Sequence, residues 1–153
     1  MDTKKKAAIM SLLQEKIKAI GTEVQLRELE NGYLSLSFLT SMRDDGSGFV
    51  FFELGMIDYE DFTLFQIVVT ILPRIGKQLP ELEKTIAHWN LTSLIGAYGI
   101  YYPQDQMYYK NRFLLVDSLD PEDLVPLIMN YLYVAYDEIE DKYETAVQIC
   151  QGN

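Results

Sequence analysis

The chain has 153 residues, 48% apolar and 24% charged, and its 23 acidic and 13 basic residues give a net charge of −10. This composition is typical of a soluble globular protein, so we expect residues 1–153 to form a single domain. Nucleic acids and anionic membrane surfaces both require clustered basic residues, so the charge argues against either as a partner.

The single cysteine, Cys150, excludes an internal disulfide. Residues 1–7 lack the apolar segment of a secretion signal. The longest apolar stretches, residues 65–72 and 124–136, are too short or too often interrupted to span a bilayer. We therefore expect a cytoplasmic protein.

Residues 3–20 predict a helix, because apolar residues recur there three and four positions apart. Asp2 or Thr3 can cap its first amides, and Gly21 suits a left-handed C-terminal cap. Residues 24–27 and 34–38 then alternate apolar and polar side chains around Asn31-Gly32. This pattern predicts a hairpin with a type I′ turn, one face covered and the other in water.

Two further strands are predicted at residues 49–54 and 62–72, after a loop over residues 41–48. The loop sequence Asp44-Asp45-Gly46-Ser47-Gly48 lacks the ligand spacing of a calcium site, which favours a plain turn. The strand at 62–72 is apolar on both faces. We therefore expect it in the sheet centre, or between a helix and a second body, and Pro73 ends it.

The second half predicts a helix at 80–91, a Tyr-rich hairpin of strands 95–102 and 106–116, and a helix at 121–149 capped by Asp120. The last helix would be about 40 Å long in a domain about 30 Å across, so we expect part of it to project or to pack on a second subunit. The order α-β-β-β-β-α-β-β-α predicts an α+β fold, an antiparallel sheet with helices packed against it.

With these elements the chain resembles the YbjN-like family, which shares the type III secretion chaperone-like fold. The matching segments are His88-Trp89-Asn90-Leu91, Gly96-Ala97-Tyr98, Gln104-Asp105 and Leu119-Asp120. The strand at 62–72, before the second helix, departs from the family pattern. The resemblance implies a non-enzymatic chaperone-like domain, often dimeric. Secretion chaperones of this fold bind partly unfolded effectors along sheet and helix surfaces, and YbjN-like proteins are linked to regulation.

Catalytic and metal chemistry find little support in the residues. His88 is the only histidine and Cys150 the only cysteine, and the two fall on different predicted helices. A single His and a single Cys cannot supply a structural zinc site. We therefore expect neither an enzyme nor a cofactor or metal, with His88 flanking the end of the second helix.

The tyrosines of the second hairpin and the acidic residues of the last helix are the candidate binding residues. Tyrosine combines a large apolar surface with a polar tip, which suits a partly exposed interface, although half of these side chains could instead be core. The acidic stretch would steer a basic partner. The partner-binding candidates are Tyr98, Tyr101, Tyr108, Tyr109, Asp137, Glu138, Asp141 and Glu144.

We therefore expect a non-catalytic protein-interaction module, chaperone-like or regulatory, that binds a protein partner or itself through sheet and helix surfaces. A homodimer is the expected assembly. The alternative is an acidic immunity or antitoxin-like protein that masks a basic partner, and the net charge alone favours it.

Overall fold

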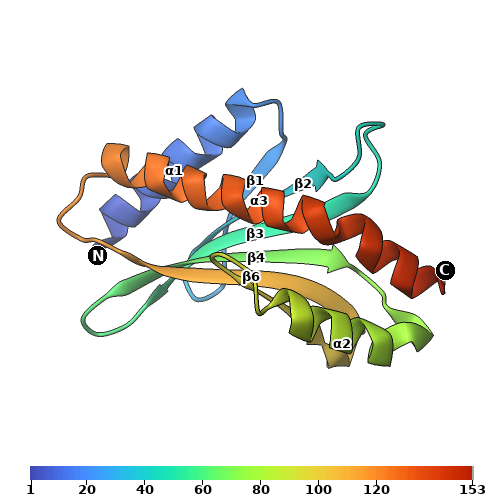
Figure 1. Cartoon of the computed structure of the whole chain (residues 1–153). Coiled ribbons are helices and arrows are strands. Elements are labelled where there is room, and N and C mark those ends of the chain that lie inside the picture. Colours follow the sequence, from blue (N-terminus) through green and yellow to red (C-terminus); the bar gives the residue numbers. More distant parts are fainter. Residues whose placement is uncertain (153) are drawn as a thin grey trace.

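The computed structural model describes residues 1–152, and within them the chain forms three α-helices and a six-stranded antiparallel sheet (Figure 1). The predicted order α-β-β-β-β-α-β-β-α and the α+β class are confirmed. The helices are α1 (Thr3–Ala19), α2 (Leu79–Trp89) and α3 (Pro121–Gln151). The strands are β1 (Val24–Glu28), β2 (Leu34–Ser41), β3 (Phe49–Asp58), β4 (Thr63–Leu72), β5 (Ala97–Tyr101) and β6 (Gln106–Leu115). Two short 3-10 helices, η1 (Gly76–Gln78) and η2 (Tyr102–Gln104), precede α2 and β6.

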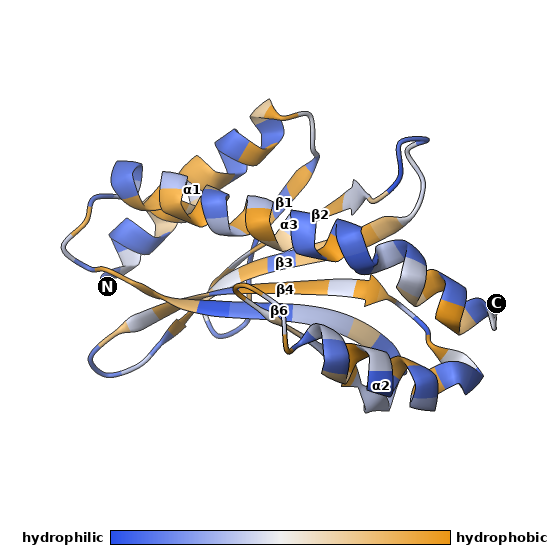
Figure 2. Cartoon of the chain, viewed as in Figure 1, coloured by the Kyte–Doolittle hydropathy of each residue, from blue (hydrophilic) through white to orange (hydrophobic). Residues whose placement is uncertain are grey.

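The strands lie in the order β1-β2-β3-β4-β6-β5, so the hairpin of β5 and β6 joins the sheet through β6. β4 therefore pairs with β3 on one side and β6 on the other. The prediction that the strand with two apolar faces lies inside the sheet is confirmed, and Figure 2 shows how apolar β4 is along its length.

The helices cover one face of the sheet. Pairing places Leu36, Leu54, Ile67 and Asn111 side by side across β2, β3, β4 and β6, and all four are buried. On this side α1 contacts β1 and β2, α2 contacts β5, and α3 contacts β4 and β6. The buried residues of both layers form one hydrophobic core.

The long helix α3 is packed over its whole length rather than projecting. Leu124 near its start is 2% exposed and Ala146 near its end is fully buried. The helix crosses the sheet, continues over η1, and ends at Gly152, which has a φ of 74°. The expectation that part of α3 projects is therefore wrong, because η1 extends the surface on which it packs.

Two local predictions are corrected. The β1–β2 turn is not type I′, because only Gly32 has a positive φ and Asn31 does not. Gly32 N donates to Leu29 O at 2.8 Å, which is the arrangement of a type I turn followed by a left-handed glycine. Asn31 Oδ1 instead accepts from the backbone of Tyr33 at 3.2 Å.

The second correction is that only one of the two predicted N-terminal caps uses its side chain. Asp2 caps α1 as predicted, accepting from Lys5 N at 2.8 Å. Asp120 stands at the N-cap of α3, but within residues 1–152 its side chain makes no capping hydrogen bond. Its backbone oxygen accepts from Asp123 and Leu124 instead.

Over residues 1–152, none of the helices has both the length and the apolar composition needed to cross a membrane.

Candidate interaction surface

The face of the sheet that points away from the helices is uncovered, since every helix among the described residues packs on the other side. Side chains alternate along each strand, so the residues next to the buried ones point to this face. On it, Leu39 of β2 is 56% exposed, Phe49 of β3 is 59% exposed and Leu114 of β6 is 57% exposed. We call it the open face.

Strand pairing gathers the apolar residues of the open face into rows. One row across the sheet is Leu39, Phe51, Thr70, Tyr108 and Gly99. A second row is Ile57, Leu64 and Leu114. Each row places large apolar side chains on neighbouring strands, and exposed apolar surface of this kind on soluble proteins marks interaction sites.

Between these rows the open face has a hollow above Gly55. It has a volume of about 450 Å³ and is lined by Ser35, Glu53, Gln66 and Val68, among others. Gly55 lacks a side chain there, and a Cβ at this position would come no closer than 3.9 Å to Leu34 O. A side chain from another molecule can therefore enter without displacing the backbone.

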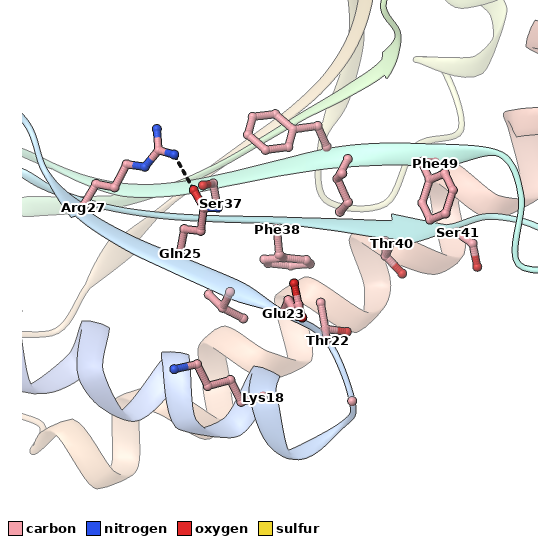
Figure 3. Close-up of a pocket in the computed structure, with 14 residues that line it drawn as sticks. Lys18, Thr22, Glu23, Gln25, Arg27, Ser37, Phe38, Thr40, Ser41 and Phe49 are labelled. Carbon is pink, nitrogen blue, oxygen red and sulfur yellow. Dashed lines mark hydrogen bonds between the residues drawn. The ribbon is translucent and has the colours of Figure 1, made fainter.

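A larger groove, of about 960 Å³, lies at the outer end of β2 (Figure 3). β1 begins at Val24, opposite Phe38, so residues 39–41 of β2 pair with β3 but have no partner in β1. Figure 3 shows Lys18 of α1, Arg27 of β1 and Phe49 of β3 around this groove. Unpaired strand edges accept extended chains, so the backbone of residues 39–41 offers a pairing edge beside the open face.

Charge is distributed unevenly between the two sides of the molecule. Within the six strands, the charged positions of the open face are Arg27, Lys110 and Arg112 against Glu53, three positive and one negative. The chain as a whole carries −10. The acidic excess therefore lies elsewhere, including the exposed Asp137 and Asp141 of α3.

The structure divides the four predicted tyrosines into two pairs. Tyr98 is 5% exposed and Tyr109 fully buried, so both belong to the core and neither is available to a partner. Tyr98 Oη donates to Glu138 O at 2.6 Å, and Tyr109 Oη donates to Glu138 Oε2 at 2.5 Å. Burial, and then the neighbouring Glu138, raise the pKa of both phenols, so both remain neutral donors.

Tyr101 and Tyr108 lie on the other side of the same hairpin. Tyr101 is 48% exposed, and Tyr108 is half-buried on the open face. The Tyr108 ring lies over Gly99, where a Cβ would come within 2.5 Å of it. These two tyrosines extend the apolar surface of the open face to β5.

The four predicted acidic residues likewise separate. Glu138 faces inward, since its Oε1 accepts from Ser93 Oγ at 3.0 Å and Leu94 N at 2.5 Å.

Glu144 binds Arg43 of the β2–β3 loop through two hydrogen bonds, of 2.5 and 3.1 Å. The hydrogen bond from Arg43 lowers the pKa of Glu144. Asp137 and Asp141 remain exposed, and Asp141 pairs with the adjacent Lys142.

Trp89 and Asn90, which end α2, join this helix to the sheet. Asn90 Nδ2 donates to Tyr98 O at 2.9 Å, and Tyr98 N donates to Asn90 Oδ1 at 2.8 Å. The Trp89 ring packs edge-on against Tyr98 at 5.5 Å. Asn90 thus acts as a short strand partner for the outer edge of β5, a role that its position after a helix does not reveal.

His88 and Cys150 lie apart in the fold from the open face. His88 is exposed in the last turn of α2, as predicted, and Cys150 is half-buried near the end of α3. Burial raises the pKa of the Cys150 thiol. Across the part of the chain that the structure describes, no three His, Cys, Asp or Glu side chains converge as metal ligands would.

No model of a known protein family matches this chain, and no curated protein matches it.

Proposed function

We propose that this protein is a non-catalytic protein-interaction module, chaperone-like or regulatory, that binds protein through the open face of its sheet. The observation that carries the proposal is the set of large apolar side chains in one row across that face, Leu39, Phe51 and Tyr108, with Thr70 between the two aromatic rings. The uncovered face of an antiparallel sheet is normally polar, so large apolar side chains on it indicate a surface that another molecule covers. The resemblance to YbjN-like proteins supports the same function.

The binding residues of this proposal differ from those that the sequence favoured. Tyr101 and Tyr108 are kept, because both are accessible. Tyr98, Tyr109 and Glu138 hold α3 against the β5–β6 hairpin. The principal anchors become the apolar residues of β2, β3 and β6, such as Leu39 and Leu114.

The test is capture of bound protein by a tagged chain, comparing one variant on each side of the molecule. Leu39→Ser removes an apolar contact from the open face. Leu127→Ser makes the same change on α3, where Leu127 is 47% exposed. We expect Leu39→Ser to weaken binding at least about 10-fold, because it removes a large apolar contact of the interface, and Leu127→Ser to bind as the wild type does. Equal binding by all three chains, or a loss with Leu127→Ser alone, would reject the open face.

A second candidate function, masking of a basic partner, is favoured by the exposed Asp137 and Asp141 one turn apart on α3. In the same capture experiment, a basic protein retained by Leu39→Ser but lost by an Asp137→Asn/Asp141→Asn variant would support it. Retention by that double variant would exclude it.

A further inference from the structure

We infer that the protein the open face binds is a second copy of this chain, in a face-to-face dimer whose twofold axis runs close to β4. The inference rests on the proposed function and names the partner of the same surface. It is carried by three properties of the face, namely the symmetry of its strands, the placement of its charges and the hollow above Gly55.

The strand order supplies the symmetry. Leaving aside β1, the order β2-β3-β4-β6-β5 has β4 at its centre. β3 and β6 are both antiparallel to β4 and therefore parallel to each other. When two copies stack face to face about a twofold axis along β4, β3 of one copy lies over β6 of the other. Aligned stacking of this kind, with a modest rotation from strand twist, is the common way in which sheets pack.

The charges then complement each other. Glu53 and Lys110 occupy the same row, on either side of Val68. They are two strand spacings apart, about 10 Å, which is too far for a direct ion pair within one chain. Indeed, neither forms a salt bridge among the described residues. In the dimer Val68 meets its own copy, and Glu53 lies over Lys110 of the partner subunit, so that two equivalent ion pairs form.

The apolar rows match in the same way. The row Phe51, Thr70 and Tyr108 places the Phe51 ring over Tyr108 of the partner subunit, with the two threonines at the centre. The row Ile57, Leu64 and Leu114 brings Ile57 over Leu114 of the partner subunit. In this dimer aromatic side chains face aromatic ones and aliphatic side chains face aliphatic ones, as in the buried centre of protein interfaces.

The hollow receives a second basic residue of the open face. Gly55, Gln66 and Arg112 share a row, so the twofold axis brings Arg112 of the partner subunit over Gly55. The hollow there is lined by Glu53, which would face both Lys110 and Arg112 of the partner subunit. The Arg112 side chain of the partner subunit therefore enters a cavity that Glu53 lines, so the cavity offers both space and a negative charge to the guanidinium.

The size of the face predicts a weak dimer. Five strands about 4.8 Å apart and about eight residues of about 3.4 Å each give roughly 650 Å² per copy. The total of roughly 1,300 Å² is near the lower limit of specific interfaces. We therefore expect dissociation in the micromolar range, so that monomer and dimer exchange.

The test reverses the two charges separately and then mixes the variants. Lys110→Glu leaves two acidic residues facing each other in the dimer, and Glu53→Lys leaves two basic ones. Each variant alone should dissociate at least about 30-fold more readily than the wild type, because facing like charges are strongly unfavourable. An equimolar mixture should recover dimer, since every acidic residue then faces a basic one. Sedimentation velocity at high micromolar concentration measures all four samples.

Matched controls make the same charge changes away from the open face. Lys84→Glu on α2 and Glu15→Lys on α1 alter exposed residues and should dimerise as the wild type does. Circular dichroism confirms that each variant is folded, and recovery on mixing is itself evidence of folding.

Three outcomes would overturn the inference: a monomeric wild type, a dimer insensitive to both reversals, and a mixture that stays monomeric. The proposed function is judged separately by the capture experiment. A monomeric wild type whose Leu39→Ser variant loses a different captured protein would reject the second copy and keep the open face as a binding surface.

Discussion

Tyr108 and Tyr109 are neighbours in the chain and have opposite environments. Tyr109 is fully buried and hydrogen-bonded to Glu138, whereas Tyr108 lies on the open face over Gly99. The alternation of side chains along β6 produces this difference. Each Tyr meets a glycine, because Gly96 lies against the Tyr109 ring as Gly99 does against Tyr108.

The Gly96 position yields a prediction about stability. A Cβ at residue 96 would overlap the ring of Tyr109, which the core and Glu138 hold in place. Gly96→Ala should therefore lower the free energy of unfolding by about 2 kcal/mol, as overpacking of a core does. Urea titration measures the loss. Gly55→Ala is the control, because its Cβ meets only Leu34 O at 3.9 Å, and it should change stability by less than about 1 kcal/mol. Equal effects of the two substitutions would contradict this account of Gly96.

At this scale the sequence predicted that half of the hairpin tyrosines could be core, but not which of them. Period-two spacing and the hairpin register pair Tyr98 with Tyr109. Both faces of β6 carry apolar residues, and the helix-facing side also carries the buried Asn111, which is polar. Composition therefore could not separate core tyrosines from surface ones.

Among the elements, α1 is tied to the sheet by a polar contact as well as by its apolar stripe. Lys6 Nζ donates to Asp58 Oδ2 at 2.5 Å, and Thr63 Oγ1 donates to Asp58 Oδ1 at 2.9 Å. Burial acts to raise the pKa of Asp58, but these two donors outweigh it and the pKa is lowered. The carboxylate thus joins α1 to both strands of the β3–β4 hairpin.

This contact predicts a dependence of stability on pH. Because the pKa of Asp58 is lower in the folded chain than its unfolded value of about 3.9, its contribution is present at pH 7 and is lost as the pH falls below that value. Asp58→Asn should lower the free energy of unfolding by about 1 kcal/mol at pH 7 and by much less at pH 2. Denaturant titrations at both pH values measure this. The exposed Asp61 is the control, and Asp61→Asn should have little effect at either pH. A difference for Asp58→Asn that stays constant with pH would show that the carboxylate charge is not involved.

Element types and order were predictable because each segment had a clear period and a turn residue after it. The helix at Thr3–Ala19 and the strand at Thr63–Leu72 lie within two residues of the predicted bounds. The position of the β5–β6 hairpin in the sheet was not predictable. It depends on β6 pairing with β4 across a helix and a second strand, and local sequence does not encode that contact.

For the whole molecule, the net charge of −10 is distributed unevenly, because the open face carries more basic than acidic residues. The acidic stretch of α3 is partly neutralised by Arg43 and partly turned inward at Glu138, whereas the open face combines apolar rows with basic residues. The sequence alone favoured a basic partner steered to α3. The dimer that we infer would instead use the open face, where Glu53 is the acidic residue that pairs with Lys110 of the partner subunit.

The most direct measurement of this account is a methyl NMR spectrum of the wild-type chain recorded over a range of concentrations. We predict that the methyl signals of Ile57, Leu64 and Val68, all on the open face, shift as the concentration rises, while that of Leu127 on α3 does not. Shifts confined to Leu127, or a spectrum that does not change with concentration, would contradict binding of a second copy at the open face.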